Sequence, residues 1–112
     1  MRIIKEKTLN EYCRLDRYKK AESAIRSWIY EVRFSKWNNA AELKAKYKNA
    51  SIISSKRVVF NIKGHDYRLG VDIEYQLKIV FVVWFGTHNE YDNINVKTVN
   101  YDSKSDKNRK RI

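Results

Sequence analysis

A histidine and a tyrosine lie three positions apart in the segment Gly86-Thr-His-Asn-Glu-Tyr-Asp92, directly after the most apolar stretch of the chain. Thr87 and Glu90 have the spacing of a capping box, which predicts that a short helix begins at His88. His88 and Tyr91 would then share one side of that helix. A helix start attracts phosphate and favours neutral imidazole, which suits general acid or base catalysis. The alternative is that His88 only packs and caps.

A second candidate surface comes from two segments in which apolar and polar side chains alternate, 57–62 and 67–75. Gly64 lies between them and predicts a turn, so the two segments should pair as a hairpin. Pairing would bring Arg68 and Asn61 onto one polar surface, together with Arg57. An arginine there could bind a phosphate in bidentate fashion, and the alternative is an ordinary solvated sheet face.

The elements that must position these residues divide the chain into a helical half and a strand half. Thr8 and Glu11 have capping-box spacing, residues 21–32 repeat apolar side chains at helical intervals, and Asn39 is placed to cap a helix over 40–47. We expect Trp28 and Trp37 to pack in the core. Three strands follow, the last of them at 79–85, and Ile3-Ile4 is a possible short strand. The expected fold is α+β, with N-terminal helices packed on a twisted antiparallel sheet of three to five strands.

Length and charge narrow the classes of protein that this chain can represent. Its 112 residues suit one domain, which we place at 1–101, followed by a basic tail at 102–112 that we expect to be disordered. The 24 Lys and Arg exceed the 13 Asp and Glu by 11, which indicates an anionic partner such as nucleic acid, anionic lipid or an acidic protein. A lone Cys13, no metal-ligand spacing, no signal sequence and no membrane-length apolar run predict a cytoplasmic protein without a metal site.

Three blocks follow one another along the strand half and the segment before it: Ala40–Lys44 after Trp37, then Arg57–Leu69, then Phe85–Asp92. In order and spacing these blocks resemble the HigB-type toxins of bacterial toxin–antitoxin modules, within the wider RelE-like group of mRNA interferases. The resemblance runs from about residue 25 to residue 94. The positions that match the family's motif are Asn61, Gly64, Tyr67, Arg68, Gly86, Thr87, His88, Glu90, Tyr91 and Asp92.

The resemblance implies a RelE-like fold and metal-independent, cofactor-free cleavage of mRNA, generally on the translating ribosome. It also implies inhibition by a cognate antitoxin, commonly one with a helix-turn-helix domain. Two departures from the family pattern remove positive charge near the expected RNA face. His65 and Asp66 stand where the family usually has Asn-Lys, and Val83 stands where a basic residue is common.

We therefore predict an endoribonuclease toxin in which His88 acts as base or acid, Arg68 stabilises the phosphate charge, and Tyr91 orients the base or donates a proton. The residues that we expect to contact RNA are Lys56, Arg57, Asn61 and His65. The main alternative is a non-catalytic RNA- or DNA-binding module, because phosphate affinity needs only the positive charge. A third possibility is an interaction protein whose basic face binds an acidic partner.

Overall fold

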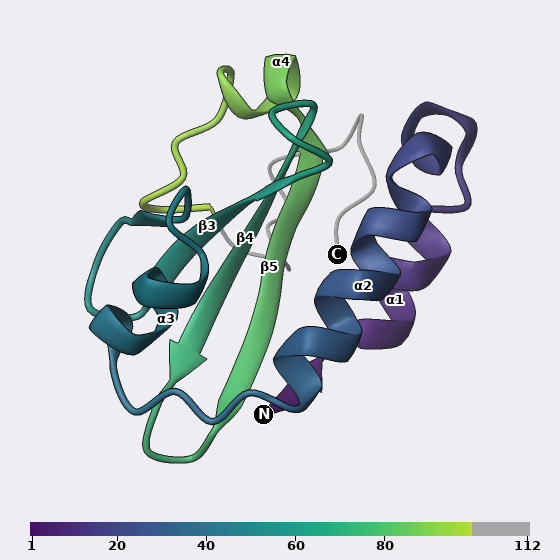
Figure 1. Ribbon diagram of the computed structural model, residues 1–112. Coiled ribbons are helices and arrows are strands. Elements are labelled where there is room, and N and C mark those ends of the chain that lie inside the picture. Colours follow the sequence, from purple (N-terminus) through teal and green to yellow (C-terminus); the bar gives the residue numbers. More distant parts are fainter. Residues whose placement is uncertain (100–112) are drawn as a thin grey trace.

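A computed structural model describes residues 1–99 of the chain, which form one sheet and the helices packed around it (Figure 1). The five strands lie in the order β1-β5-β4-β3-β2. Their bounds are β1 Arg2–Ile4, β2 Ser51–Ile52, β3 Arg57–Ile62, β4 Tyr67–Glu74 and β5 Ile79–Thr87. The helices are α1 Glu6–Tyr12, the 3-10 helix η1 Asp16–Ala21, α2 Glu22–Arg33, α3 Ala40–Lys46 and α4 His88–Tyr91.

The predicted α+β class is confirmed, but the sheet is mixed and not antiparallel throughout. β2, β3, β4 and β5 pair antiparallel, whereas β1 pairs parallel with β5, with Ile3 opposite Val80. A hairpin turn fixes the antiparallel direction of neighbouring strands such as β3 and β4. Most of the chain separates β1 from β5 in the sequence, so no tight turn between them fixes their relative direction.

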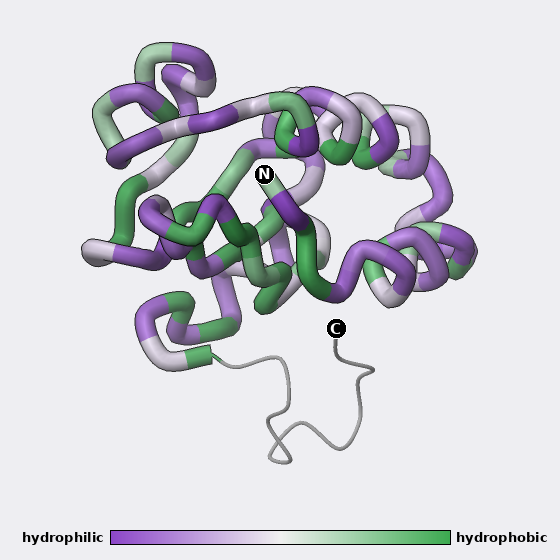
Figure 2. Tube along the Cα trace, turned by 90° about the horizontal axis from the view of Figure 1, so that it is seen from below, coloured by the Kyte–Doolittle hydropathy of each residue, from purple (hydrophilic) through white to green (hydrophobic). Residues whose placement is uncertain are grey.

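The core lies between the helices and one face of the sheet. On α2, Ile25, Trp28, Ile29 and Val32 are buried, and the Trp28 ring meets the edge of Phe60 with 5.4 Å between ring centroids. Figure 2 shows hydrophobic residues gathered along the central strands, while the helices alternate in hydropathy along their turns. The helical period read from the sequence therefore places the expected side chains in the core, and Trp37 is buried there as well.

Two of the three predicted helix starts are confirmed. The Asn39 side chain accepts a hydrogen bond from the backbone N–H of Glu42 at 2.9 Å, and the capping box before α4 is complete. The start predicted at Thr8 is wrong. α1 begins at Glu6, and Lys5 precedes it in a left-handed conformation, so Thr8 lies inside the helix. The short chain between β1 and α1 requires this tight turn, which forces the helix to begin earlier than its capping pattern indicates.

β5 contains an irregularity that its apolar sequence does not indicate. Gly70 pairs with Trp84 and Val71 with Val82, so Val83 is an extra residue opposite the step between Gly70 and Val71. Such a bulge shifts the alternation of side chains by one position. It allows Val82 and Phe85, three residues apart, both to join the core. Val83 itself is 3% exposed.

The basic tail predicted at 102–112 lies outside the described residues, as does the end of the predicted domain. Within residues 1–99, no helix is long and apolar enough to cross a membrane.

Candidate active site

The β3–β4 hairpin and the start of α4 meet at one end of the sheet (Figure 1). Gly64 adopts a φ of +65° in the hairpin turn, a conformation that residues with a Cβ rarely adopt. The predicted hairpin is confirmed, and its register sets Asn61 directly opposite Arg68. On the other side of β4, Arg68 lies opposite Gly86 of β5, two residues before His88. The sheet register therefore brings the two candidate surfaces of the sequence together at Arg68.

Arg68 and His88 form a direct hydrogen bond across the two elements. The guanidinium Nη2 lies 2.8 Å from the imidazole Nδ1, and because a guanidinium only donates, Nδ1 is the acceptor. The neutral imidazole then carries its proton on Nε2. That nitrogen lies 3.5 Å from a carboxylate oxygen of Asp92, one helical turn further along the chain. His88 is exposed, so its Nε2–H proton is available to a bound substrate.

Two further N–H donors of Arg68 hold the guanidinium against the hairpin turn. Its Nη1 donates to the backbone carbonyls of His65 at 2.9 Å and Tyr67 at 3.2 Å. With the bond to His88, these contacts engage three of the five N–H donors that an arginine has. Two N–H donors remain on a half-buried cation at the edge of an exposed surface. This arrangement suits the binding of a phosphate beside His88.

Tyr91 lies next to Arg68, on the same side of α4 as His88, as the sequence spacing predicted. The Arg68 guanidinium carbon is 5.9 Å from the centroid of the Tyr91 ring, and the ring contacts Trp84 at 6.0 Å between centroids. Burial raises the pKa of the Tyr91 phenol, Arg68 opposes this shift and Asp92 adds to it. The phenol therefore stays protonated at neutral pH, which makes it a hydrogen-bond donor and a poor base.

α4 is held in place by a carboxylate that the N-terminal half of the chain binds. Glu90 accepts the Thr87 backbone N–H at 2.9 Å as part of the capping box. It also accepts the phenol O–H of Tyr18, at 2.8 Å and 2.9 Å from its two oxygens, and pairs with Arg17 at 3.4 Å. The backbone N–H of His88 donates to the carbonyl of Asp66 at 2.9 Å. These contacts fix the helix that carries His88 against both η1 and the hairpin.

The four residues expected to contact RNA separate into two groups. Asn61 and His65 lie at the site, where the Asn61 Nδ2 is 3.5 Å from the His65 Nδ1. Lys56 and Arg57 lie at the other end of β3, and at about 3.3 Å per residue Arg57 is roughly 13 Å along the strand from Asn61. Lys56 pairs with Glu74 at 3.7 Å.

The Arg57 side chain is 9% exposed, and four of the five N–H donors of its guanidinium are engaged away from the site. It forms a bidentate pair with Asp72, at 2.5 Å and 2.9 Å, and donates to the carbonyls of Val96 and Val99 at 2.8 Å each. The expectation of one surface shared by Arg57, Asn61 and Arg68 therefore does not match the structure. The local hairpin pattern places Arg57 on the polar face, but the segment after α4 covers that position.

Among residues 1–99, no three or more His, Cys, Asp or Glu side chains form a group that could hold a metal ion. The centre of the described site has the Arg68 guanidinium, the His88 imidazole, the Tyr91 phenol and the Asp92 carboxylate. These are the groups of proton transfer and phosphate binding.

The sequence model of HigB toxins, RelE-like toxic components of toxin–antitoxin systems, matches residues 21–94. The match spans well over half of the chain and includes the hairpin, β5 and α4. The chain belongs to the HigB toxin family. A cognate antitoxin is therefore its partner. No curated protein matches the chain significantly.

Reasoning from the sequence of this HigB-family toxin missed two residues of the site. Asp92 was named only as part of a motif, although its spacing of four from His88 places both on one face of a helix. Tyr18 gave no signal, because it lies 72 residues from Glu90 in the sequence. Val83, which stands where a basic residue is common in the family, is buried in the β5 bulge and presents no side chain to the site surface.

Proposed function

We propose that this toxin is a metal-independent endoribonuclease that cleaves mRNA on the translating ribosome, in the cytoplasm, and so inhibits translation. The observation that carries the proposal is the 2.8 Å contact between the Arg68 guanidinium and the His88 imidazole. It combines a cation that can bind a phosphate with an imidazole that can donate a proton to the substrate. The chain's charge of +11 supports attraction to RNA.

In the proposed reaction, the 2′-hydroxyl of one nucleotide attacks its own 3′-phosphate in line with the departing 5′-oxygen. As the new O–P bond forms, solvent water at this exposed site accepts the proton of the 2′-hydroxyl. The products are a 2′,3′-cyclic phosphate and a 5′-hydroxyl. The 5′-oxygen needs a proton as it leaves, and His88 supplies it from Nε2 because Arg68 occupies Nδ1. The two remaining N–H donors of Arg68 stabilise the charge that develops on the phosphate oxygens.

The neighbouring side chains position these two groups and the RNA. Tyr91 is a protonated phenol whose ring packs beside the Arg68 guanidinium, so it orients Arg68 and offers a hydrogen bond to the substrate. Asp92 lies 3.5 Å from the His88 Nε2 and holds the ring orientation until substrate binds. Asn61 and His65 extend the surface along the hairpin, where an RNA backbone next to the cleaved phosphate would lie.

Single-turnover cleavage of mRNA on programmed ribosomes tests the proposal. His88→Ala should slow cleavage by about 10² to 10⁴, the range for removal of a general acid or base, and leave ribosome binding nearly unchanged. His88→Gln retains hydrogen bonding without proton transfer and should be nearly as inactive. Asn89→Ala changes an exposed neighbour on the same helix and serves as the control.

Rates are corrected for the folded fraction by circular dichroism. A rate within about threefold of wild type in both His88 variants would remove His88 from the mechanism. If the wild-type protein binds ribosomes or RNA but cleaves neither, the non-catalytic RNA-binding module becomes the correct description.

A further inference from the structure

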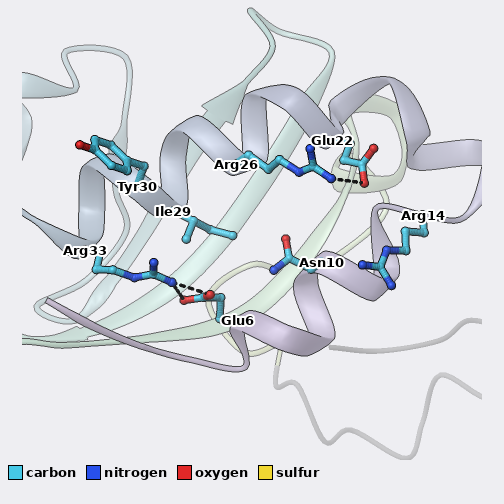
Figure 3. A pocket seen from close by; sticks show the side chains of 8 residues that line it. All are labelled: Glu6, Asn10, Arg14, Glu22, Arg26, Ile29, Tyr30 and Arg33. Carbon is cyan, nitrogen blue, oxygen red and sulfur yellow. Dashed lines mark hydrogen bonds and ion pairs between the residues drawn. The ribbon is translucent and has the colours of Figure 1, made fainter.

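A groove runs between α1 and α2 on the side of the helices that faces away from the sheet. Figure 3 shows the two helices with the strands of the sheet behind them and Ile29 near the middle of the groove. Its volume is about 310 Å³, and Tyr30, Arg26, Arg33, Glu6 and Arg14 line it together with Ile29. None of the residues that line it belongs to the candidate active site.

Two large aromatic side chains are exposed beside this groove: Tyr30, which lines it, and Phe34, which directly follows α2 and adjoins Tyr30. Tyr30 is 65% exposed and Phe34 is 69% exposed, and their rings contact each other at 5.0 Å between centroids. They stand four residues apart at the C-terminal end of α2, and their ring contact joins them into one exposed apolar patch next to the groove. Exposed apolar surface bordered by charges is typical of a protein-binding site.

The charges that border the groove favour an acidic partner. Arg33 pairs with Glu6 at 2.6 Å and Arg26 with Glu22 at 3.3 Å, both at exposed positions. Arg14 is exposed at the end nearest η1, and the described residues include no acidic partner for it. Three guanidinium groups therefore face two carboxylates, on a chain with an excess of 11 positive charges.

The length of the groove matches a short helix. Its α2 wall extends from Glu22 to Arg33, which at 1.5 Å per residue is about 16 Å, or three helical turns. An amphipathic helix of that length presents apolar side chains at intervals of three and four residues, and these can pack on the exposed rings of Tyr30 and Phe34. Acidic residues on its flanks would pair with the arginines.

We propose that this groove is the docking site for an acidic amphipathic helix of the cognate antitoxin. Membership of a toxin–antitoxin family supplies the partner, and the groove supplies a surface complementary to it. A second copy of this chain is a poor occupant, because a symmetric contact would place the same arginines against each other. The inference concerns partner binding alone and stands whether or not the proposed ribonuclease activity is correct.

The test measures binding of the full-length toxin variants to the polypeptide encoded by the open reading frame adjacent to the toxin gene, by isothermal titration calorimetry. Tyr30→Ala/Phe34→Ala and Arg14→Glu/Arg26→Glu should each raise Kd by at least about thirtyfold, as expected for central interface residues. Leu77→Ala is the matched control, because Leu77 is 68% exposed and lies in the β4–β5 turn. It should change Kd by less than about threefold.

A second measurement separates docking from folding and from catalysis. Each variant is expressed alone and with the antitoxin, and growth is followed. The groove variants should arrest growth like the wild type when alone and should escape neutralisation when the antitoxin is present. A toxin that never arrests growth would contradict the proposed function, and the calorimetry would still decide the docking site.

Three results would overturn the docking proposal. The first is a Kd within threefold of wild type for both groove variants, with circular dichroism showing them folded. The second is a dimer of the isolated toxin in analytical ultracentrifugation that the Tyr30→Ala/Phe34→Ala variant abolishes, which would assign the groove to a second copy. The third is a greater loss of affinity for a single-stranded RNA oligonucleotide than for the antitoxin in the arginine variant.

Discussion

Removal of a single hydroxyl from Tyr18 should reveal how strongly the N-terminal helices hold α4. The Tyr18 side chain is fully buried, and its O–H donates to the Glu90 carboxylate at 2.8 Å and 2.9 Å from the two oxygens. In Tyr18→Phe the ring contacts remain, namely the stack on Tyr12 at 4.7 Å and the edge contact with Phe85 at 5.4 Å between centroids. The variant therefore isolates the hydrogen bond from the packing.

The expected magnitude follows from the charge of the acceptor. A hydrogen bond to a charged group contributes about 1.5 to 3 kcal/mol. Glu90 keeps its partner Arg17, but that side chain is 62% exposed, and exposed ion pairs contribute about 0 to 1 kcal/mol. The free energy of unfolding should therefore fall by about 1.5 to 3 kcal/mol in Tyr18→Phe, measured by urea unfolding followed through tryptophan fluorescence.

Tyr75→Phe is the matched control, because the same atom is removed in a different setting. The Tyr75 hydroxyl is buried without a hydrogen-bond partner among the described residues, and burial raises the pKa of its phenol. Removal of an unsatisfied buried hydroxyl should be neutral or stabilising, within about 0.5 kcal/mol of wild type or above it. Equal losses in the two variants, or a loss below 0.5 kcal/mol in Tyr18→Phe, would refute the claim that the Tyr18–Glu90 contact anchors α4.

Three further measurements test other parts of the structure. Arg68→Ala should weaken binding to a single-stranded RNA oligonucleotide and reduce the slope of log affinity against log salt by about one unit, and an unchanged slope would place Arg68 off the RNA surface. Burial raises the pKa of the Cys13 thiol to about 12, so iodoacetamide at pH 8 should label it far more slowly in the folded protein than in urea, as followed by mass spectrometry. Labelling at the rate of a free thiol would show that Cys13 is not buried. Asn39→Ala should lower the free energy of unfolding by about 1 kcal/mol in urea, the usual effect of losing an N-cap, and an unchanged midpoint would mean that the 2.9 Å cap contributes nothing.

Local patterns in the sequence determined most of the elements that carry the site. The capping box of Thr87 and Glu90 starts α4 at His88, and Asn39 starts α3, because a side chain that caps a helix acts within one turn. The alternation on either side of Gly64 predicts the hairpin and puts Asn61 and Arg68 on the same polar face, because side chains alternate between the two faces of a strand. The capping pattern of Thr8 failed where a tight turn after β1 set the helix start instead.

The contacts that make these residues a site depend on long-range packing. The sequence placed His88 and Arg68 on separate surfaces, and their 2.8 Å contact exists because β4 pairs with β5. The same pairing contains the Val83 bulge, which no alternation pattern signals in a strand that is apolar on both faces.

Only the tertiary structure decided which polar side chains are free to bind a substrate and which are bound by partners within the protein. Arg57 is occupied by Asp72 and by carbonyls about 40 residues away, whereas Tyr18 reaches Glu90 across 72 residues. The parallel direction of β1 is likewise set by packing against β5 and not by a turn. The physical reason is the same in all three cases. Periodicity and capping patterns depend on interactions between residues that are only a few positions apart in the sequence. The partner of a buried polar group is chosen by the whole fold, because burial without a partner is costly.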